Sequence, residues 1–222
     1  MKGTKKILAL LLCLAMTGTL LSGCGGGGSE DSADGTGSRG GSKSLVIGTG
    51  QSCGTLDPLQ SYDGWYAVRF GFGQTHTKLN DDFSVSGWLV EDDYTVNEDN
   101  TVWTFTIRDD VTFSNGAKLT AELAKASLEN VYENGTRGTE YFTPASIEAE
   151  GQTLTITTEN PEPILPNKLA DPYFTIIDTT VDMTNIADEG PIGTGPFVVE
   201  SFDPTTKETV VVKNENYWGG EV

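Results

Sequence analysis

Few residues in this chain could perform acid–base or nucleophilic chemistry. His76 is the only histidine, so a Ser-His-Asp or Cys-His arrangement would have a single possible base. Pairing His76 with Cys53 would unite two isolated residues, because neither lies in a local catalytic motif. The chain also lacks a His/Cys cluster for zinc, and its acidic clusters lack the ligand spacing of a calcium loop. The sequence therefore predicts a protein that is not an enzyme and has no cofactor and no metal site.

The residues best suited to binding are aromatic. Tyr62, Trp65, Tyr66 and Tyr141 lie in segments that have the composition of loops and show no strand alternation. Amphipathic rings in such places are typical of a ligand-binding cleft. The alternative is ordinary packing under loops, because aromatic side chains bury a large apolar area anywhere in a fold.

The overall charge argues against one class of partner. The formal net charge is -18, from 14 basic and 32 acidic residues. Such a body repels phosphate, and no basic stripe interrupts it, so we expect no nucleic-acid partner. A solvated acidic surface that keeps an exported protein soluble is sufficient to explain the charge.

Residues 1–23 are predicted to be a lipoprotein signal peptide. Lys2, Lys5 and Lys6 precede an apolar stretch that ends in Leu21-Ser-Gly-Cys24, a small-residue cleavage site. A transmembrane helix is the alternative, but it needs about 20 consecutive apolar residues, and polar residues interrupt this run. We therefore expect Cys24 to become a lipidated N-terminus, which would anchor the protein to a membrane without spanning it.

Residues 24–44 are predicted to be a tether, because this Gly/Ser-rich stretch has almost no apolar group to bury. Residues 45–222 remain for folding, enough for one domain or two small subdomains. After removal of the signal peptide and lipidation of Cys24, Cys53 is the only thiol left, so no intramolecular disulfide is expected.

The folded part combines strand and helix patterns. Thr101–Arg108 alternates Trp, Phe and Ile with Thr and Arg, which predicts a strand with one buried face. Thr120 is expected to cap a helix that runs to about Asn134 and buries an apolar stripe. Further strands or hairpins are predicted at Leu45–Gly48, Ile147–Thr158 and Pro196–Lys213. This combination predicts an α+β fold rich in antiparallel hairpins.

Three blocks, in this order, resemble family 5 extracellular solute-binding proteins, which serve ABC importers for dipeptides, oligopeptides and nickel. The first block is Thr55-Leu-Asp-Pro58. The second is Trp103-Thr-Phe-Thr-Ile-Arg-Asp-Asp-Val-Thr-Phe-Ser-Asn-Gly116 with Thr120-Ala-Glu122. The third comprises Pro191-Ile-Gly-Thr-Gly195 and Asn214-Glu-Asn-Tyr-Trp-Gly219. The second and third blocks are most similar to the nickel-binding branch.

The resemblance implies two lobes that close on a ligand. This chain would supply lobe I of a periplasmic-binding-protein-like fold (type II, cluster C), with mixed sheets and antiparallel hairpins. The second lobe is expected to be missing, so the sequence would be a fragment or a truncated form. A discontinuous core domain would comprise residues 45–70 and 179–222, with an inserted α+β subdomain at residues 71–178.

The resemblance also implies ligand-binding residues. By position, the loop that lines the cleft in the family corresponds to Tyr62, Gly64, Trp65 and Tyr66, and an aromatic residue after the helix corresponds to Tyr141.

Two departures from the family leave the ligand class open. Nickel-binding relatives place an arginine that holds the chelator's carboxylates just after the short helix, and Ala170-Asp-Pro-Tyr-Phe174 has none. Peptide-binding relatives often place an acid near the position of Tyr62 for the ligand's amine, and only Asp63 could take that role.

The function implied is an extracytoplasmic, lipid-anchored solute-binding subunit of a bacterial ABC importer, with peptides or chelated nickel as ligands and ABC permease subunits as partners. The alternative is a lipoprotein that acts as a structural or partner-binding module and binds no solute.

Overall fold

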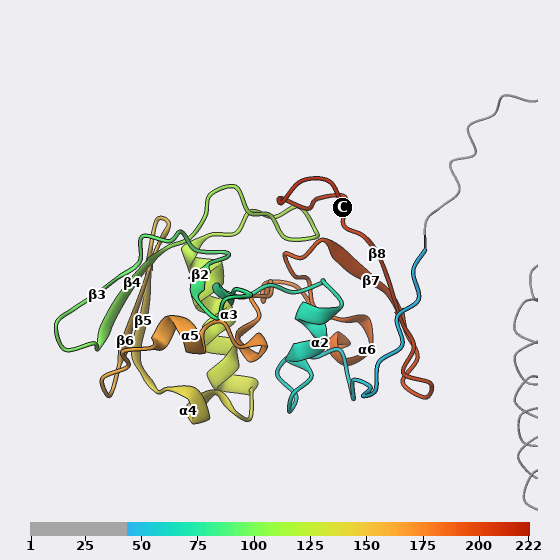
Figure 1. Ribbon diagram of the computed structural model, residues 1–222, viewed down its shortest axis with the longest axis horizontal. Helices are drawn as coiled ribbons and strands as arrows, with labels where there is room; N and C mark the ends of the chain where they lie inside the picture. Colours follow the sequence, from blue (N-terminus) through green and yellow to red (C-terminus); the bar gives the residue numbers. More distant parts are fainter. Residues whose placement is uncertain (1–43) are drawn as a thin grey trace, which may run out of the picture. The chain divides into compact units, whose positions relative to one another are not determined.

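A four-stranded antiparallel sheet and one long helix carry the larger of two hydrophobic cores (Figure 1). The computed structural model describes residues 44–222. The predicted signal peptide, Cys24 and the tether up to residue 43 therefore lie outside the described residues. Gly48–Val222 forms one compact unit, to which the following description applies.

The sheet has the strand order β3-β4-β6-β5, with all neighbours antiparallel. In chain order the strands are β3 (Thr95–Val96), β4 (Val102–Thr106), β5 (Pro144–Glu150) and β6 (Thr153–Thr158). The alternation predicted for β4 is confirmed, because Trp103 and Phe105 are buried and their neighbours on the strand are not. Both pair with buried residues of β6, Ile156 and Leu154, so large apolar side chains gather on one face.

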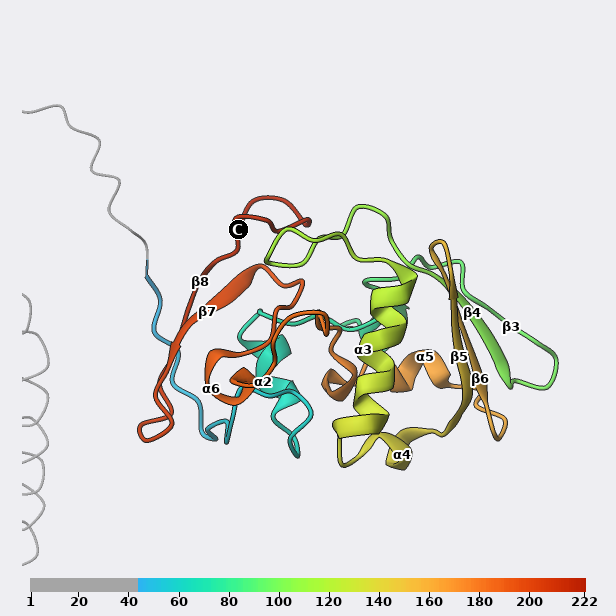
Figure 2. The same ribbon diagram turned by 180° about the vertical axis from the view of Figure 1, so that it is seen from behind.

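Helix α3 (Ala121–Asn134) packs along β5 and β6 (Figure 2). Thr120 is its N-cap, as predicted, and the Thr120 hydroxyl accepts a hydrogen bond from the backbone N–H of Leu123 at 3.3 Å. Ala124, Leu128 and Val131 recur at helical spacing and are buried.

Helix α3 ends at Gly135, where close neighbours leave no room for a side chain. Its φ of -82° is open to any residue, so no left-handed conformation requires glycine there. A Cβ at Gly135 would lie 2.4 Å from the carbonyl oxygen of Val131 and 2.5 Å from the Tyr173 hydroxyl. Glycine thus lets Tyr173 approach the end of the helix.

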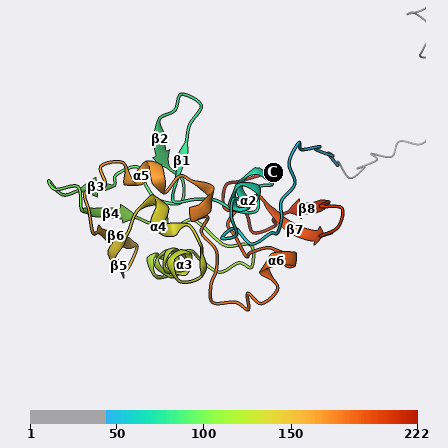
Figure 3. The same cartoon turned by 90° about the horizontal axis from the view of Figure 1, so that it is seen from below.

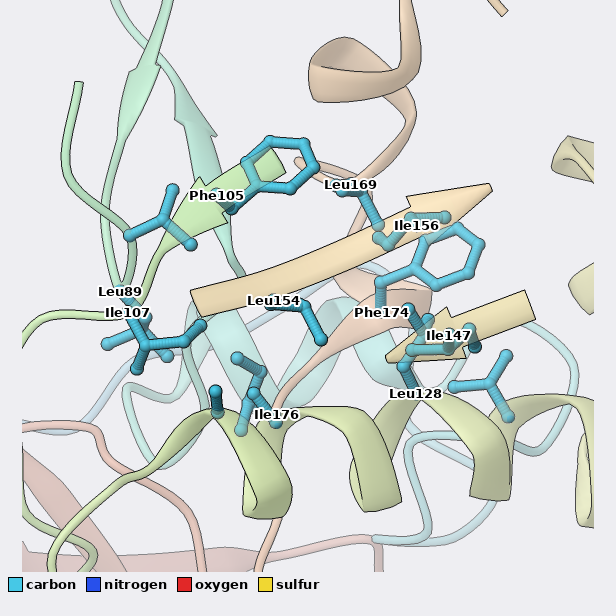
Figure 4. Close-up of a cluster of buried hydrophobic side chains, with 14 of the residues drawn as sticks. Leu89, Phe105, Ile107, Leu128, Ile147, Leu154, Ile156, Leu169, Phe174 and Ile176 are labelled. Carbon is cyan, nitrogen blue, oxygen red and sulfur yellow. The ribbon is translucent and has the colours of Figure 1, made fainter. Parts of the chain in front are cut away.

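Helix α5 spans Leu165–Lys168. The segment that follows it packs against the core between α3 and the sheet. Figure 4 shows Leu128 directed toward Ile147 and the neighbouring strands, with Leu169 and Phe174 in the same cluster. Phe174 belongs to the short helix η1 (Pro172–Phe174).

A second, smaller core lies beside a two-stranded sheet, β7 (Phe197–Phe202) and β8 (Thr209–Lys213). It includes residues of α2 (Gly64–Arg69). Its buried members are Cys53, Leu56, Tyr66, Ala67 and Phe72. The two cores draw mainly on different parts of the chain, but the domain boundaries given above stay a prediction.

Short elements complete the described unit. Strands β1 (Thr77–Leu79) and β2 (Val85–Gly87) form a hairpin that projects from the body (Figure 3). Like α5, the helices α4 (Gly138–Tyr141) and α6 (Ile186–Glu189) are single turns. The predicted α+β class with antiparallel hairpins is confirmed.

The prediction of a buried strand at Leu45–Gly48 is wrong. Leu45, Val46 and Ile47 are exposed, and the segment belongs to no strand. A strand needs a neighbouring strand to pair its backbone groups, and no strand within residues 44–222 pairs with this segment.

No helix in the same range has the length and apolar character needed to cross a bilayer.

Candidate ligand-binding site

Tyr62 and Trp65 are the most accessible of the aromatic residues predicted to bind ligand. Tyr62 is 58% exposed and Trp65 is 42% exposed, at the turn that leads into α2 and in its first helical turn. Their rings meet edge to face with centroids 6.4 Å apart. The Arg69 guanidinium, from the last turn of α2, lies 5.1 Å from the Trp65 ring centre. Rings this exposed are available for contact with a partner molecule.

Tyr66 and Gly64 face the interior. Tyr66 is buried in the smaller core against Phe70. Gly64 is also buried, and a Cβ there would lie 2.6 Å from the carbonyl oxygen of Pro172 and 2.9 Å from that of Pro58. Gly64 therefore allows α2 to pack closely against η1, which brings Tyr62 and Trp65 next to the segment around residue 172.

Arg137 is the centre of the site, and the sequence analysis did not single it out. Its guanidinium lies 4.0 Å from the ring centre of Tyr62 and 5.3 Å from the ring centres of both Tyr141 and Tyr173. A guanidinium within about 6 Å of an aromatic ring centre is attracted by the ring's electrons. Arg137 therefore ties together the α2 entry turn, α4 and η1.

Hydrogen bonds fix this arrangement. The Arg137 side chain donates to the Ser61 carbonyl oxygen (3.0 Å), the Tyr141 hydroxyl (3.0 Å) and Glu140 (3.2 Å). Its backbone N–H donates to the Tyr173 hydroxyl at 2.8 Å. A guanidinium has five N–H groups, so two remain without a partner among the described residues.

Residues of η1 and α5 contact Tyr141 and hold it in place. It stacks on Tyr173 with centroids 5.9 Å apart and meets Phe174 edge to face at 5.1 Å. From α5, the Lys168 ammonium donates to the Tyr141 carbonyl oxygen at 2.6 Å. Contacts within the chain thus hold Tyr141 in place.

A carboxylate also lies at the site. Burial, followed by the negative charge of Asp171, raises the pKa of Tyr141 to about 12, and the positive charge of Arg137 acts in the opposite direction. Asp63 is the acid considered above for a ligand amine. It accepts a hydrogen bond from the Gly54 N–H at 3.0 Å and so stabilises the loop that contains Gly54. Glu140, which pairs with Arg137, is therefore not the only acid near the cluster, because Asp171 also acts on Tyr141.

The residues considered for catalysis do not form a site. Burial lowers the pKa of His76 to about 4, and neither ring nitrogen has a hydrogen-bond partner among residues 44–222, so His76 does not pair with Cys53. Burial raises the pKa of the Cys53 thiol, which makes it a poor nucleophile. No group of three or more potential metal ligands occurs within residues 44–222.

A cavity among the described residues lies elsewhere. It has a volume of about 480 Å³ and is lined by the segment around α6 and by β7, including Asp178, Met183, Ile186, Pro191 and Val199. None of the predicted aromatic residues lines it. At the site around Arg137, Tyr62 and Trp65 are exposed, whereas Tyr173 is buried.

Comparison with known proteins identifies the family that shares this α+β fold. The model described as "Bacterial extracellular solute-binding proteins, family 5 Middle" matches residues 84–222. This chain belongs to that family.

Its relatives include binding proteins of different ligands. The nickel-binding protein NikA of Staphylococcus aureus is 33% identical over 165 residues, covering 73% of this chain and 32% of NikA. The glutathione-binding protein GsiB of Salmonella typhi is 32% identical over 192 residues, covering 79% of this chain and 35% of GsiB. The chain spans about a third of the length of these curated relatives.

The fold agrees with a solved structure. The crystal structure of a nickel ABC transporter protein from Bacillus halodurans superposes with a TM-score of 0.70 at 34% identity, covering 77% of this chain and 34% of that one.

The candidate site is thus partly predictable. Tyr62, Trp65 and Tyr141 lie in one neighbourhood, whereas Tyr66 and Gly64 support it from beneath. A signal for Arg137 was available: it stands four residues before Tyr141, a spacing that brings side chains together on a helical turn.

Proposed function

We propose that this chain supplies one wall of the solute-binding subunit of a bacterial ABC importer, and that the subunit takes up peptides or chelated nickel. Membership in family 5 supports the binding role, and the relatives named above bind nickel and glutathione. Its partners would be ABC permease subunits. The protein would act outside the cytoplasm and have no catalytic role.

The observation that carries this proposal is the aromatic setting of Arg137. Two of its N–H groups have no partner within residues 44–222, and the exposed ring of Tyr62 lies against it, with Trp65 next to Tyr62. A guanidinium can bind a carboxylate through two parallel hydrogen bonds, and the rings can cover the ligand's apolar part. Ligands of importers of this kind, peptides and chelates, carry carboxylates.

The site is also preorganised. Contacts from the α2 entry turn, α4, α5 and η1 hold Arg137 and Tyr141 in place without a ligand. Preorganised groups lose less conformational entropy on binding, which favours affinity. A second lobe closing over this wall would remove the ligand from water.

Calorimetry on the full-length protein tests the proposal. Glutathione, a dipeptide mixture and nickel with a small carboxylate chelator would be titrated into the wild type and into Arg137→Gln. We expect at least one ligand to bind the wild type and the variant to bind it at least tenfold more weakly. Absence of binding by the wild type would favour the alternative of a partner-binding lipoprotein.

The membrane anchor is a separate part of the proposal. We expect Cys24→Ala to abolish incorporation of a labelled fatty acid, because the sulfur that would carry the lipid is removed. Cys53→Ala is the matched control and should label normally, since this thiol is buried in the fold. Labelling of Cys24→Ala at the wild-type level would rule out the anchor.

A further inference from the structure

The cavity beside α6 and β7 has the size and the walls of a small-molecule site. Its volume of about 480 Å³ lies within the range of about 300 to 1,000 Å³ that is usual for such sites. Apolar side chains form much of the wall, among them Ile177, Met183, Ile186 and Val199. Ile177 is buried and the other three are half-buried. The cavity is therefore suited to a ligand with an apolar body.

The charged groups of this cavity all have the same sign. No lysine, arginine or histidine belongs to its lining. Its carboxylates are those of Asp178, Asp182, Asp188, Glu189 and Glu200. A space bordered by one sign of charge attracts ions of the opposite sign, so the cavity favours a cation. No group of three or more potential metal ligands occurs within residues 44–222, which favours an organic cation over a metal ion.

Asp178 is the acid that the fold buries at this cavity, with only 3% of the residue exposed. Its Oδ1 atom accepts hydrogen bonds from the N–H (3.0 Å) and the hydroxyl (2.6 Å) of Thr180. Its Oδ2 atom accepts one from the side-chain amide of Asn115 at 2.9 Å. Burial acts to raise the pKa of Asp178, but these hydrogen bonds lower it overall, so the carboxylate is ionised at neutral pH.

The buried charge of Asp178 has no opposite charge beside it. None of the ion pairs within residues 44–222 includes Asp178, and its donors Thr180 and Asn115 are neutral. A buried ionised carboxylate is usually paired with a cation, because its removal from water is otherwise costly. A carboxylate accepts about four hydrogen bonds, so an acceptor position is left for a further donor.

We propose that this cavity is a second binding site, which takes an organic cation with a primary ammonium group on an apolar alkyl or aryl body. The ammonium group donates to Asp178, and the apolar body packs against Ile186 and Val199. Neither Arg137 nor any of the predicted aromatic residues lines the cavity, so this site is separate from the candidate ligand-binding site. It does not depend on the importer function proposed above.

Calorimetry on the full-length protein with three related compounds tests the proposal. Phenethylamine carries an ammonium group on an aromatic body, phenethyl alcohol has the same body without the charge, and hydrocinnamate carries a negative charge instead. We expect phenethylamine to bind the wild type at least tenfold more tightly than phenethyl alcohol, and hydrocinnamate not to bind. Equal binding of the amine and the alcohol, or no binding of the amine, would overturn the proposal.

Asp178→Asn removes the charge and keeps the shape of the side chain. We expect this variant to bind phenethylamine at least tenfold more weakly than the wild type. Asp82→Asn is the matched control, because Asp82 accepts the equivalent bonds from the N–H (3.0 Å) and the hydroxyl (2.6 Å) of Ser84 and lies outside the cavity lining. The control should bind phenethylamine as the wild type does.

A second variant fills the cavity and leaves the charge unchanged. Asp178→Asn weakens the hydrogen bond from Asn115 and so costs some stability, whereas Ile186→Trp adds volume at a half-buried position of the lining. We expect Ile186→Trp to keep the melting temperature of the wild type and to bind phenethylamine at least tenfold more weakly. Wild-type affinity in either folded variant would contradict the site.

Arg137→Gln separates this site from the aromatic one. It should bind phenethylamine with the affinity of the wild type, because Arg137 does not line the cavity. Loss of phenethylamine binding in Arg137→Gln would assign the amine to the aromatic site and overturn the second site. The importer proposal is tested with its own ligands, so either proposal can fail while the other stands.

Discussion

At the scale of single residues, the burial of His76 makes the stability of the fold depend on pH. It is fully buried with no hydrogen bond to either ring nitrogen, and burial lowers its pKa from 6.5 to about 4. The nearby Phe174 backbone opposes this shift only in part. Below pH 6.5 the unfolded chain binds a proton that the folded chain does not bind until about pH 4. Stability therefore falls as the pH decreases through this window.

We expect His76 to cost about 2 kcal/mol of unfolding free energy between pH 7 and pH 5. Denaturant unfolding of the wild type and of His76→Gln at both pH values measures this, because glutamine does not titrate. The variant should lose less stability than the wild type over the same interval. Equal losses would show that His76 is protonated in the folded protein.

Gly64 gives a second prediction at this scale. A Cβ at this position would press on the backbone oxygens of Pro172 and Pro58, which cannot move aside as a flexible side chain could. Gly64→Ala should therefore destabilise the fold by about 1 to 3 kcal/mol, the usual range for overpacking. Gly48→Ala is the control, because no atom lies within 4 Å of a Cβ there. Similar melting temperatures for the two variants would contradict this account.

At the scale of elements, aromatic residues differ by their position. Those buried between the sheet and α3 stabilise the fold, whereas exposed ones outside this core are the candidates for ligand binding. Trp103 on β4 is 6% exposed, and its indole N–H donates to the Glu162 carbonyl oxygen at 3.0 Å. Trp103→Ala should cost about 3 to 5 kcal/mol of unfolding free energy. Tyr62→Ala should cost about 1 kcal/mol or less, chiefly the contact with Arg137. Denaturant midpoints decide between them, and a larger loss for Tyr62→Ala would refute this division.

Local patterns were sufficient to predict β4, α3 and the hairpins β5–β6 and β7–β8, but they did not predict the β1–β2 hairpin. Trp103 and Phe105 alternate with threonines, and Thr120 is followed by a stripe at helical spacing, so each signal lies within one element. For the segment of α2 the sequence pattern does not distinguish helix from loop, because Gly71 and Gly73 weaken any helix that would include them. The structure ends the helix at Arg69, just before these glycines.

The site was harder to predict than the fold, because its contacts join distant segments. Tyr62, Arg137 and Asp171 are brought together only by packing of α2, α4 and η1. The burial of Tyr66 likewise depends on its neighbours in the smaller core and on no local pattern. Sequence alone indicated which residue types could bind a ligand, and the tertiary contacts determined which of them face outward.

At the scale of the whole molecule, the wall around Arg137 is one side of a proposed two-lobe clamp. Tyr62 and Trp65 are open to water, and neither lines the cavity beside α6 and β7. A ligand bound here alone would keep much of its surface hydrated. Each of its hydrogen bonds would then contribute only about 1 kcal/mol net.

The clamp predicts a difference between a short and a long form of the protein. Residues 24–222 without lipid should bind peptides or chelated nickel weakly or not at all, because one wall forfeits the contact area that closure supplies. A chain extended through the further length found in its relatives should bind the same ligand tightly. Calorimetry on both forms, with circular dichroism to establish that the shorter one is folded, measures the difference. Equal, tight binding by the two forms would mean that the wall around Arg137 is a complete site, and the clamp would have to be abandoned for this protein.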